Sequence, residues 1–278
     1  MIKYTVGGVQ TTVYCWKFPD SCVGIDINSG AQSPDLTVPK VVVTLIFGSE
    51  GFSINDDIIA LAFVKSALRN QYPVANIHLY MPYTPYARQD RAVNAGEAHQ
   101  LKVIGQMIND MNFATVTVVD PHSIATLACF DRLHVVDQYE IFSGIRQSFR
   151  ETYIVAPDAG ATKKCEDFAK RVGAAGVITC AKTRDFANKS AITGLRVIDE
   201  VPVNADLLVL DDICDGGRTF IEVAKELRKY NPERLDLAVT HGLFTKGVGV
   251  VKDFYDKVFT SNDYISDKTG AIVVDSGF

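Results

Sequence analysis

The chain has 278 residues, of which 47% are hydrophobic and 22% charged, and its formal net charge is −5. This balance excludes global disorder, and the negative charge argues against a sequence-independent nucleic-acid binder. No apolar run approaches the roughly 18 residues of a membrane helix, and no signal peptide opens the chain, so we expect a cytoplasmic protein with no nucleic-acid and no membrane partner.

Strand and helix patterns alternate in the first half of the chain. The predicted elements are a strand at Val41–Phe47, a helix from Ser53 to Arg69, a strand at Ile77–Met81, a helix within Glu97–Met111 and a strand at Thr115–Val119. The periodic signal then weakens over residues 138–151, where we expect a domain boundary.

The second half repeats the alternation. The predicted elements are strands at Tyr153–Ala156, Gly176–Cys180, Leu207–Leu210 and Leu235–Thr240, and helices that carry the apolar stripes Cys165–Val172 and Phe220–Leu227. Strands separated by segments of helix length predict an α/β protein with mostly parallel sheets flanked by helices.

The segment Leu208–Thr219 carries the strongest local signal. An apolar strand runs into the turn acids Asp211 and Asp212, and Gly216 and Gly217 then open a helix. Glycine lets the backbone approach an anion, and the free N–H groups and dipole of a helix start favour phosphate. Ionised carboxylates only accept hydrogen bonds, so the acids suit ribose hydroxyls or a metal. The alternative is a helix-capping turn without a ligand; a dinucleotide site is disfavoured because the G-x-G-x-x-G pattern is absent.

The segment from Asp211 to Thr219 resembles the phosphoribosyl-pyrophosphate loop of type I phosphoribosyltransferase folds. Further segments match the ribose-phosphate pyrophosphokinase family in the expected order along nearly the whole chain: Phe18–Asp20, Pro85–Arg91, Val119–His122, Val155–Gly160 and Ala181–Arg184. The chain resembles a short form of this family. This resemblance implies two tandem phosphoribosyltransferase-like domains. We place them at 1–142, with an ATP signature, and at 143–278, with a ribose 5-phosphate loop.

The resemblance also implies which residues bind the two substrates. ATP is assigned to Phe18, Asp20, Arg88, Gln89, Asp90 and His122, and ribose 5-phosphate to Asp211, Asp212, Asp215, Gly216, Gly217, Arg218 and Thr219. The residue types fit, because arginine suits a planar grip on phosphate or a base. From residue types alone, the Arg88 segment could equally be a solvated surface turn.

A magnesium ion is the cofactor that the resemblance implies. His122 and Asp158 are expected to help place Mg²⁺ with the ATP phosphates, and Asp120 is a further candidate ligand. Magnesium takes few protein carboxylates and leaves its other positions to water and phosphate oxygens, so a sparse ligand set is reasonable. Without the resemblance, a structural role for His122 would be favoured.

Lys182 and Arg184 begin a polar stretch that runs to Arg196. Positions i and i+2 of an extended segment point the same way, so both cations could reach one phosphate. The resemblance makes them the catalytic residues of a loop that closes over the transferred group, where cations stabilise the transition state. A solvated loop without this role is the alternative.

The implied reaction is Mg²⁺-dependent transfer of the pyrophosphoryl group of ATP to O1 of ribose 5-phosphate, giving 5-phosphoribosyl 1-pyrophosphate and AMP for nucleotide and NAD biosynthesis. Sites shared between subunits in the family imply self-association, as a dimer or a hexamer of dimers. Because the chain is shorter than typical members, we also expect weak or absent feedback by ADP.

Two departures from the family pattern keep alternatives open. Cys22 stands where a carboxylate is expected near the adenine, and Arg218 occupies a glycine position of the phosphate loop, where backbone strain is a concern. The first alternative is a non-catalytic regulatory homologue of the synthetase. The second is a phosphoribosyltransferase that consumes phosphoribosyl pyrophosphate.

Overall fold

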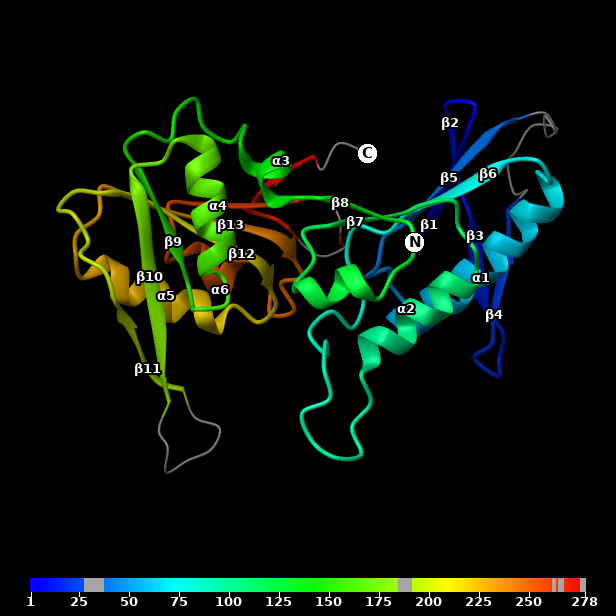
Figure 1. Ribbon diagram of the computed structural model, residues 1–278, viewed down its shortest axis with the longest axis horizontal. Helices are drawn as coiled ribbons and strands as arrows, with labels where there is room; N and C mark the ends of the chain where they lie inside the picture. The colour runs from blue at the N-terminus through cyan, green and yellow to red at the C-terminus, as the bar shows by residue number, and fades with distance from the viewer. Residues whose placement is uncertain (28–37, 185–191, 262–263, 265–267, 276–278) are drawn as a thin grey trace. The chain divides into compact units, whose positions relative to one another are not determined.

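The computed structural model describes residues 1–27, 38–184, 192–261, 264 and 268–275, and the chain divides into two compact units (Figure 1). Unit 1 runs from Met1 to Val136 and also includes Tyr264, and unit 2 begins at Asp137. The predicted boundary after residue 142 falls at the end of helix α3 (Gln138–Phe142). Among the helices that the structure describes, none is long and apolar enough to cross a membrane.

Unit 1 contains, in its described residues, a six-stranded sheet of order β2-β1-β5-β6-β7-β8. Strands β5 to β8 are parallel, β1 is antiparallel to both its neighbours, and β3 and β4 form a separate antiparallel pair. The elements are β1 (Ile2–Val6), β2 (Val9–Thr12), β3 (Tyr14–Lys17), β4 (Val23–Asp26), β5 (Lys40–Leu45), α1 (Ile54–Gln71), β6 (Asn76–Tyr80), α2 (Gln100–Asp110), β7 (Val116–Val119), the 3-10 helix η1 (Ile124–Ala128) and β8 (Leu133–Val136).

Helix α1 begins at the predicted signal. The Ser53 hydroxyl accepts the N–H of Asp56, and the Asp56 carboxylate accepts the N–H of Ser53 at 2.7 Å, which completes a capping box. The buried side chains of α1 include Leu61, Val64 and Leu68, which recur at helical spacing. The helix predicted over this stretch is therefore confirmed.

Helix α2 begins at Gln100, three residues later than the start of the predicted stretch at Glu97. The Glu97 carboxylate instead accepts the backbone N–H groups of Val93 (2.8 Å) and Asn94 (3.0 Å). Glu97 therefore closes a turn ahead of the helix.

Unit 2 contains, in its described residues, a seven-stranded sheet of order β11-β10-β9-β12-β13-β14-β15. All neighbouring pairs are parallel except β10 and β11. The remaining elements are β9 (Thr152–Ala156), α4 (Thr162–Val172), β10 (Gly176–Arg184), β11 (Ile192–Val197), β12 (Asp206–Cys214), α5 (Arg218–Arg228), β13 (Arg234–Gly242), α6 (Gly249–Lys252), β14 (Lys257–Ser261) and β15 (Ile272–Val274). The prediction of an α/β protein with two mostly parallel sheets is confirmed.

Strand β12 is longer than predicted. Leu207 and Val209 pack in the core together with Phe220 and Val223 of α5, as expected for a strand buried by a helix. The strand continues to Cys214, because β13 beside it extends to Gly242 and pairs with it over this length. The expectation that Asp211 and Asp212 are turn residues is therefore wrong, since both lie within β12.

Candidate functional site

The loops that follow β9, β12 and β13 lie at one edge of the unit 2 sheet. These strands are parallel neighbours, so their carboxyl ends meet there, which is where ligands bind in open α/β sheets. The loop after β9 carries Asp158, the loop after β12 carries residues 215–217, and the loop after β13 carries Thr245 and Lys246. The unit 2 residues assigned to ribose 5-phosphate and to the metal therefore share this edge.

The loop at residues 215–217 leads directly into helix α5. Gly217 is the N-cap of α5 and has a φ of 77°, in the left-handed region. A Cβ atom on Gly217 would lie 2.6 Å from Cγ1 of Val251, so only glycine fits the space as well as the backbone angle. The first N–H groups of α5, which belong to residues such as Arg218 and Thr219, have no partners within the helix and can bind an anion.

Arg218 does not carry the backbone strain that its glycine position suggested. It is the first residue of α5, and it is not among the residues with positive φ. Its side chain is exposed, and no ion pair holds it among the described residues. The left-handed conformation falls on Gly217 instead, so an arginine is tolerated at the next position.

Asp211 and Asp212 form an adjacent pair of acids within the carboxyl-terminal half of β12. The Asp212 N–H donates to Oδ1 of Asp211 at 2.9 Å. Burial, and next the neighbouring Asp212 carboxyl, raise the pKa of Asp211 well above its ordinary value. A pair of this kind is stabilised by a ligand that brings positive charge or hydroxyl donors.

We expect Asp211→Asn to stabilise the free protein at neutral pH. Because the folded pKa is raised, the folded state holds a proton that the unfolded state has lost, and stability falls as pH rises from about 4 through the folded pKa. The neutral amide removes this loss and keeps an oxygen for the Asp212 N–H. The melting temperature at pH 7 is expected to rise by roughly 2–4 °C relative to wild type. No rise is expected at pH 3.

The matched control is Asp167→Asn, at an exposed acid on α4 that pairs with Arg171. This control should not raise the melting temperature. A melting temperature of the Asp211 variant that falls at pH 7 relative to wild type would contradict the direction of the pKa shift.

Asp158 lies close enough to the acid pair to act on it. Its charge contributes to the raised pKa of Asp211. Its Oδ1 accepts the backbone N–H of Gly160 at 2.9 Å and that of Ala161 at 3.3 Å, which fixes the carboxylate in the turn before α4. This edge of unit 2 therefore brings three acids together.

Four of the residues predicted to bind ATP, together with the metal candidate Asp120, lie on two neighbouring loops of unit 1. Arg88, Gln89 and Asp90 follow β6, and Asp120 and His122 follow β7, its parallel neighbour, so both loops are at the carboxyl edge of the sheet. The side chains of Arg88, Gln89 and His122 are exposed, whereas Asp120 is buried and has a φ of 37°. The Asp90 carboxylate lies 3.7 Å from Nε of Arg91.

Phe18 and Asp20 lie at the tip of the β3–β4 hairpin, on the separate two-stranded sheet. Phe18 is 48% exposed and contacts Trp16 edge to face, with 5.7 Å between ring centroids. Asp20 accepts the N–H of Cys22 at 3.0 Å, and this bond lowers the pKa of its carboxyl. Cys22, which stands where the family resemblance predicts a carboxylate, is exposed.

The structure describes the backbone of Lys182 and Arg184 but not their side chains. Strand β10 continues as a hairpin with β11, in which Lys182 pairs with Leu195. The register shifts between Thr183 and Arg184, which is the mark of a β-bulge. The inference that Lys182 and Arg184 share a face assumed regular alternation, and the bulge interrupts it.

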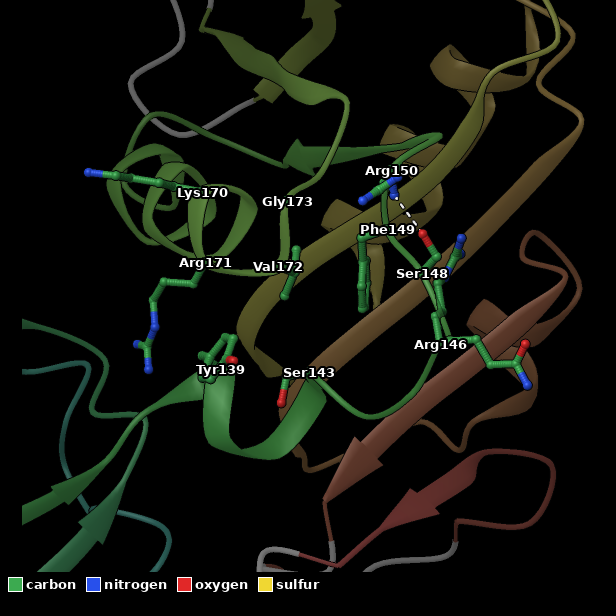
Figure 2. A pocket seen from close by; sticks show the side chains of 11 residues that line it. Tyr139, Ser143, Arg146, Ser148, Phe149, Arg150, Lys170, Arg171, Val172 and Gly173 are labelled. Atoms are coloured by element: carbon green, nitrogen blue, oxygen red, sulfur yellow. Dashed lines mark hydrogen bonds between the residues drawn. The ribbon is translucent and has the colours of Figure 1, made fainter.

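A cavity of about 520 Å³ lies elsewhere in unit 2, and no predicted site residue lines it. Its walls come from α3, residues 143–150 and the end of α4, and include Arg146, Arg150, Lys170 and Arg171 (Figure 2). These cations do not form an anion site in the cavity. Arg146 forms ion pairs with Asp206 and Asp236, and Arg171 forms one with Asp137. Figure 2 shows the side chain of Lys170 extending away from the cavity. The cavity is therefore not the candidate site.

Three residues near the acid pair and the loop were not identified from the sequence. Gln138 is buried, and its Nε2 donates to the backbone oxygen of Asp211 at 2.7 Å. The Thr245 hydroxyl donates to Oδ1 of Asp215 at 2.6 Å, and the side chain of Lys246 lies along Gly216. Only Gln138 had a sequence signal, the capping box at Asp137 that starts its helix.

Family comparisons cover both units. The N-terminal domain of ribose phosphate pyrophosphokinase matches residues 3–111, and the phosphoribosyl transferase domain matches residues 139–275. Among similar proteins, the ribose-phosphate pyrophosphokinase of Hyphomonas neptunium is 26% identical over 236 residues, which cover 82% of this chain and 70% of the relative. That of Marinomonas sp. is 29% identical over 230 residues, covering 81% and 69%.

A solved structure shows the same fold. The phosphoribosylpyrophosphate synthetase from Mycobacterium smegmatis superposes with a TM-score of 0.75 and 18% identity, over 95% of this chain and 86% of that one. Each unit therefore has the phosphoribosyltransferase-like architecture that the resemblance implied. The two domain matches, in this order, and the named relatives lead to one conclusion: the chain belongs to the ribose-phosphate pyrophosphokinase family of enzymes.

Proposed function

We propose that this chain transfers the β,γ-pyrophosphoryl group of ATP to O1 of ribose 5-phosphate. O1 attacks the β-phosphorus in line, a bond forms between them, and the bond from the β-phosphorus to the oxygen of the α-phosphate breaks. The O1 proton is released, and the products are 5-phosphoribosyl 1-pyrophosphate and AMP. Positioning and electrostatics supply most of the catalysis, as in phosphoryl transfers generally.

The observation that carries this proposal is that a loop suited to an anion lies at the same sheet edge as the half-buried Asp211 and the buried Asp212. Gly217 turns the chain into α5, whose first N–H groups are free to bind a phosphate, and Asp211 and Asp212 precede the loop on β12. This arrangement suits a ligand with a phosphate at one end and hydroxyls a few atoms away, which is a ribose phosphate.

In this proposal ATP binds through Arg88, Gln89 and Asp90, with His122 on the next loop. Arg88 and Gln89 are exposed at the carboxyl edge of the unit 1 sheet, which supports this role. Phe18 and Asp20 are proposed to contact adenine from their hairpin. Lys182 and Arg184 are the proposed catalytic cations, which stabilise charge on the transferred group.

The donor set fits a magnesium ion. Carboxylate oxygens are the ligands that Mg²⁺ prefers, and one or two suffice when phosphate oxygens and water supply the rest. The proposed ligands are Asp120 and His122 in unit 1 and, considered by itself, Asp158 in unit 2. No group of three or more histidine, cysteine, aspartate or glutamate side chains that could hold a metal ion occurs among the residues that the structure describes. When bound, Mg²⁺ neutralises the phosphate charge.

Family membership supports the wider setting that we propose. The chain works in the cytoplasm, it self-associates as a dimer or a hexamer of dimers, and its product feeds nucleotide and NAD biosynthesis.

The test is AMP release from ATP and Mg²⁺, measured with and without ribose 5-phosphate. We expect AMP only when the sugar phosphate is present. AMP that forms equally without it would contradict the proposal, and no AMP from folded protein would favour a regulatory homologue. Pyrophosphate release from phosphoribosyl pyrophosphate that depends on a nucleobase would identify a phosphoribosyltransferase.

A further inference from the structure

Hydrogen bonds connect the loop after β13 to the end of β12 and the loop that follows it. The backbone N–H of Leu243 donates to the oxygen of Cys214 at 3.0 Å, and that of Thr245 donates to the oxygen of Asp215 at 3.2 Å. The Thr245 hydroxyl adds its bond to the Asp215 carboxylate. These bonds set the position of the following residue, Lys246, relative to the loop at residues 215–217.

The side chain of Lys246 runs along Gly216. A Cβ atom on Gly216 would lie 3.6 Å from both Cδ and Cε of Lys246, which is ordinary van der Waals contact. The ammonium nitrogen is one bond beyond Cε. The charge of Lys246 is therefore held beside the segment whose next residues begin α5.

The charged side chains around the loop at residues 215–217 favour the binding of an anion. Asp215 already accepts a hydrogen bond from Thr245. No ion pair within 4 Å holds Lys246 or Arg218 in the part of the chain that the structure describes, and both side chains are exposed. Two cations thus flank the glycine turn on separate segments, and together with the N–H groups of α5 they favour a doubly charged group.

We propose that Lys246 is a specificity-determining residue whose ammonium group binds the 5-phosphate of the sugar substrate. This inference rests on the proposed function, because it assumes that a sugar phosphate occupies the loop. It adds a contact from a second segment of the chain. Lys246 then selects phosphorylated over unphosphorylated sugars and takes no part in the transfer itself.

The experiment compares wild type with Lys246→Ala and Lys246→Arg, with Lys229→Ala as the control. Lys229 is an exposed lysine that pairs with Glu226 after α5, and its loss changes the net charge by the same amount. We expect Lys246→Ala to raise KM for ribose 5-phosphate roughly tenfold or more, the effect of losing one charged hydrogen bond. The values of kcat and of KM for ATP should stay within about twofold. Lys246→Arg should recover most of the affinity, and Lys229→Ala should match wild type.

Calorimetric binding of ribose 5-phosphate without ATP separates this inference from the proposed function. A wild type that binds the sugar phosphate without turning it over, together with weaker binding by Lys246→Ala, would uphold the Lys246 contact and contradict the transfer reaction. A wild type that is active, with an unchanged KM in Lys246→Ala, would overturn the inference and leave the reaction standing. A wild type that binds no ribose 5-phosphate would overturn both.

Discussion

Replacing Lys182 by alanine is expected to lower kcat by about 10³-fold while the fold stays intact. The proposed role of Lys182 is to stabilise charge on the pyrophosphoryl group as it is transferred, and single cations in related phosphoryl transfers contribute about 10³–10⁵ in rate. The backbone pairing of β10 with β11 does not need this side chain, so melting temperature should change little. The measurement is AMP formation at saturating ATP and ribose 5-phosphate.

Lys225→Ala is the matched control, because Lys225 is an exposed lysine on α5 that pairs with Glu222. It should retain wild-type turnover. If Lys182→Ala also kept the wild-type kcat, the catalytic role of the loop that begins there would be wrong.

Gly217→Ala is expected to lower the free energy of unfolding by about 3 kcal/mol and to abolish tight binding of ribose 5-phosphate. The left-handed φ of 77° destabilises an alanine at this position by roughly 1–2 kcal/mol. The alanine Cβ would also lie 2.6 Å from Cγ1 of Val251, and this overpacking costs roughly 1–3 kcal/mol more. Relief of either strain moves the turn that aims the first N–H groups of α5. Denaturant unfolding and calorimetry measure the two effects.

Gly173→Ala separates the two causes. Gly173 ends α4 with a φ of 68°, but a Cβ atom there would meet nothing within 4 Å. Its replacement should therefore cost only the backbone strain, about 1–2 kcal/mol, and leave sugar-phosphate binding unchanged. Equal losses in the two variants would show that crowding against Val251 does not constrain the loop.

The central elements could be predicted because each has a local cause. The capping box at Ser53 and the apolar stripes of α1 and α5 mark those helices by themselves. The hairpin strands β3 and β4 were missed, because both are short and their side chains, such as the exposed Tyr14, do not alternate clearly between buried and exposed. The end of β12 was placed too early because acids interrupt the apolar run, and only the partner strand β13 shows that pairing continues.

The site could be predicted in part for the same reason. The glycine turn and the acids of β12 stand in one short segment, and the family resemblance assigns them together. Lys246 stands about thirty residues later in the chain, and its position beside Gly216 follows only from the bonds between two loops. Asp215 and Thr245 likewise meet through the parallel pairing of β12 and β13, which no local pattern shows.

The measurement that tests the central claim most directly is the fate of the ATP phosphates, followed by ³¹P NMR with ribose 5-phosphate and Mg²⁺. Transfer of the pyrophosphoryl group predicts that the α-phosphate appears only in AMP, while the β- and γ-phosphates appear together, as a diphosphate attached to the sugar. The two products should form at equal rates. Formation of ADP with a singly phosphorylated sugar hydroxyl, or of AMP with free pyrophosphate, would contradict the claim.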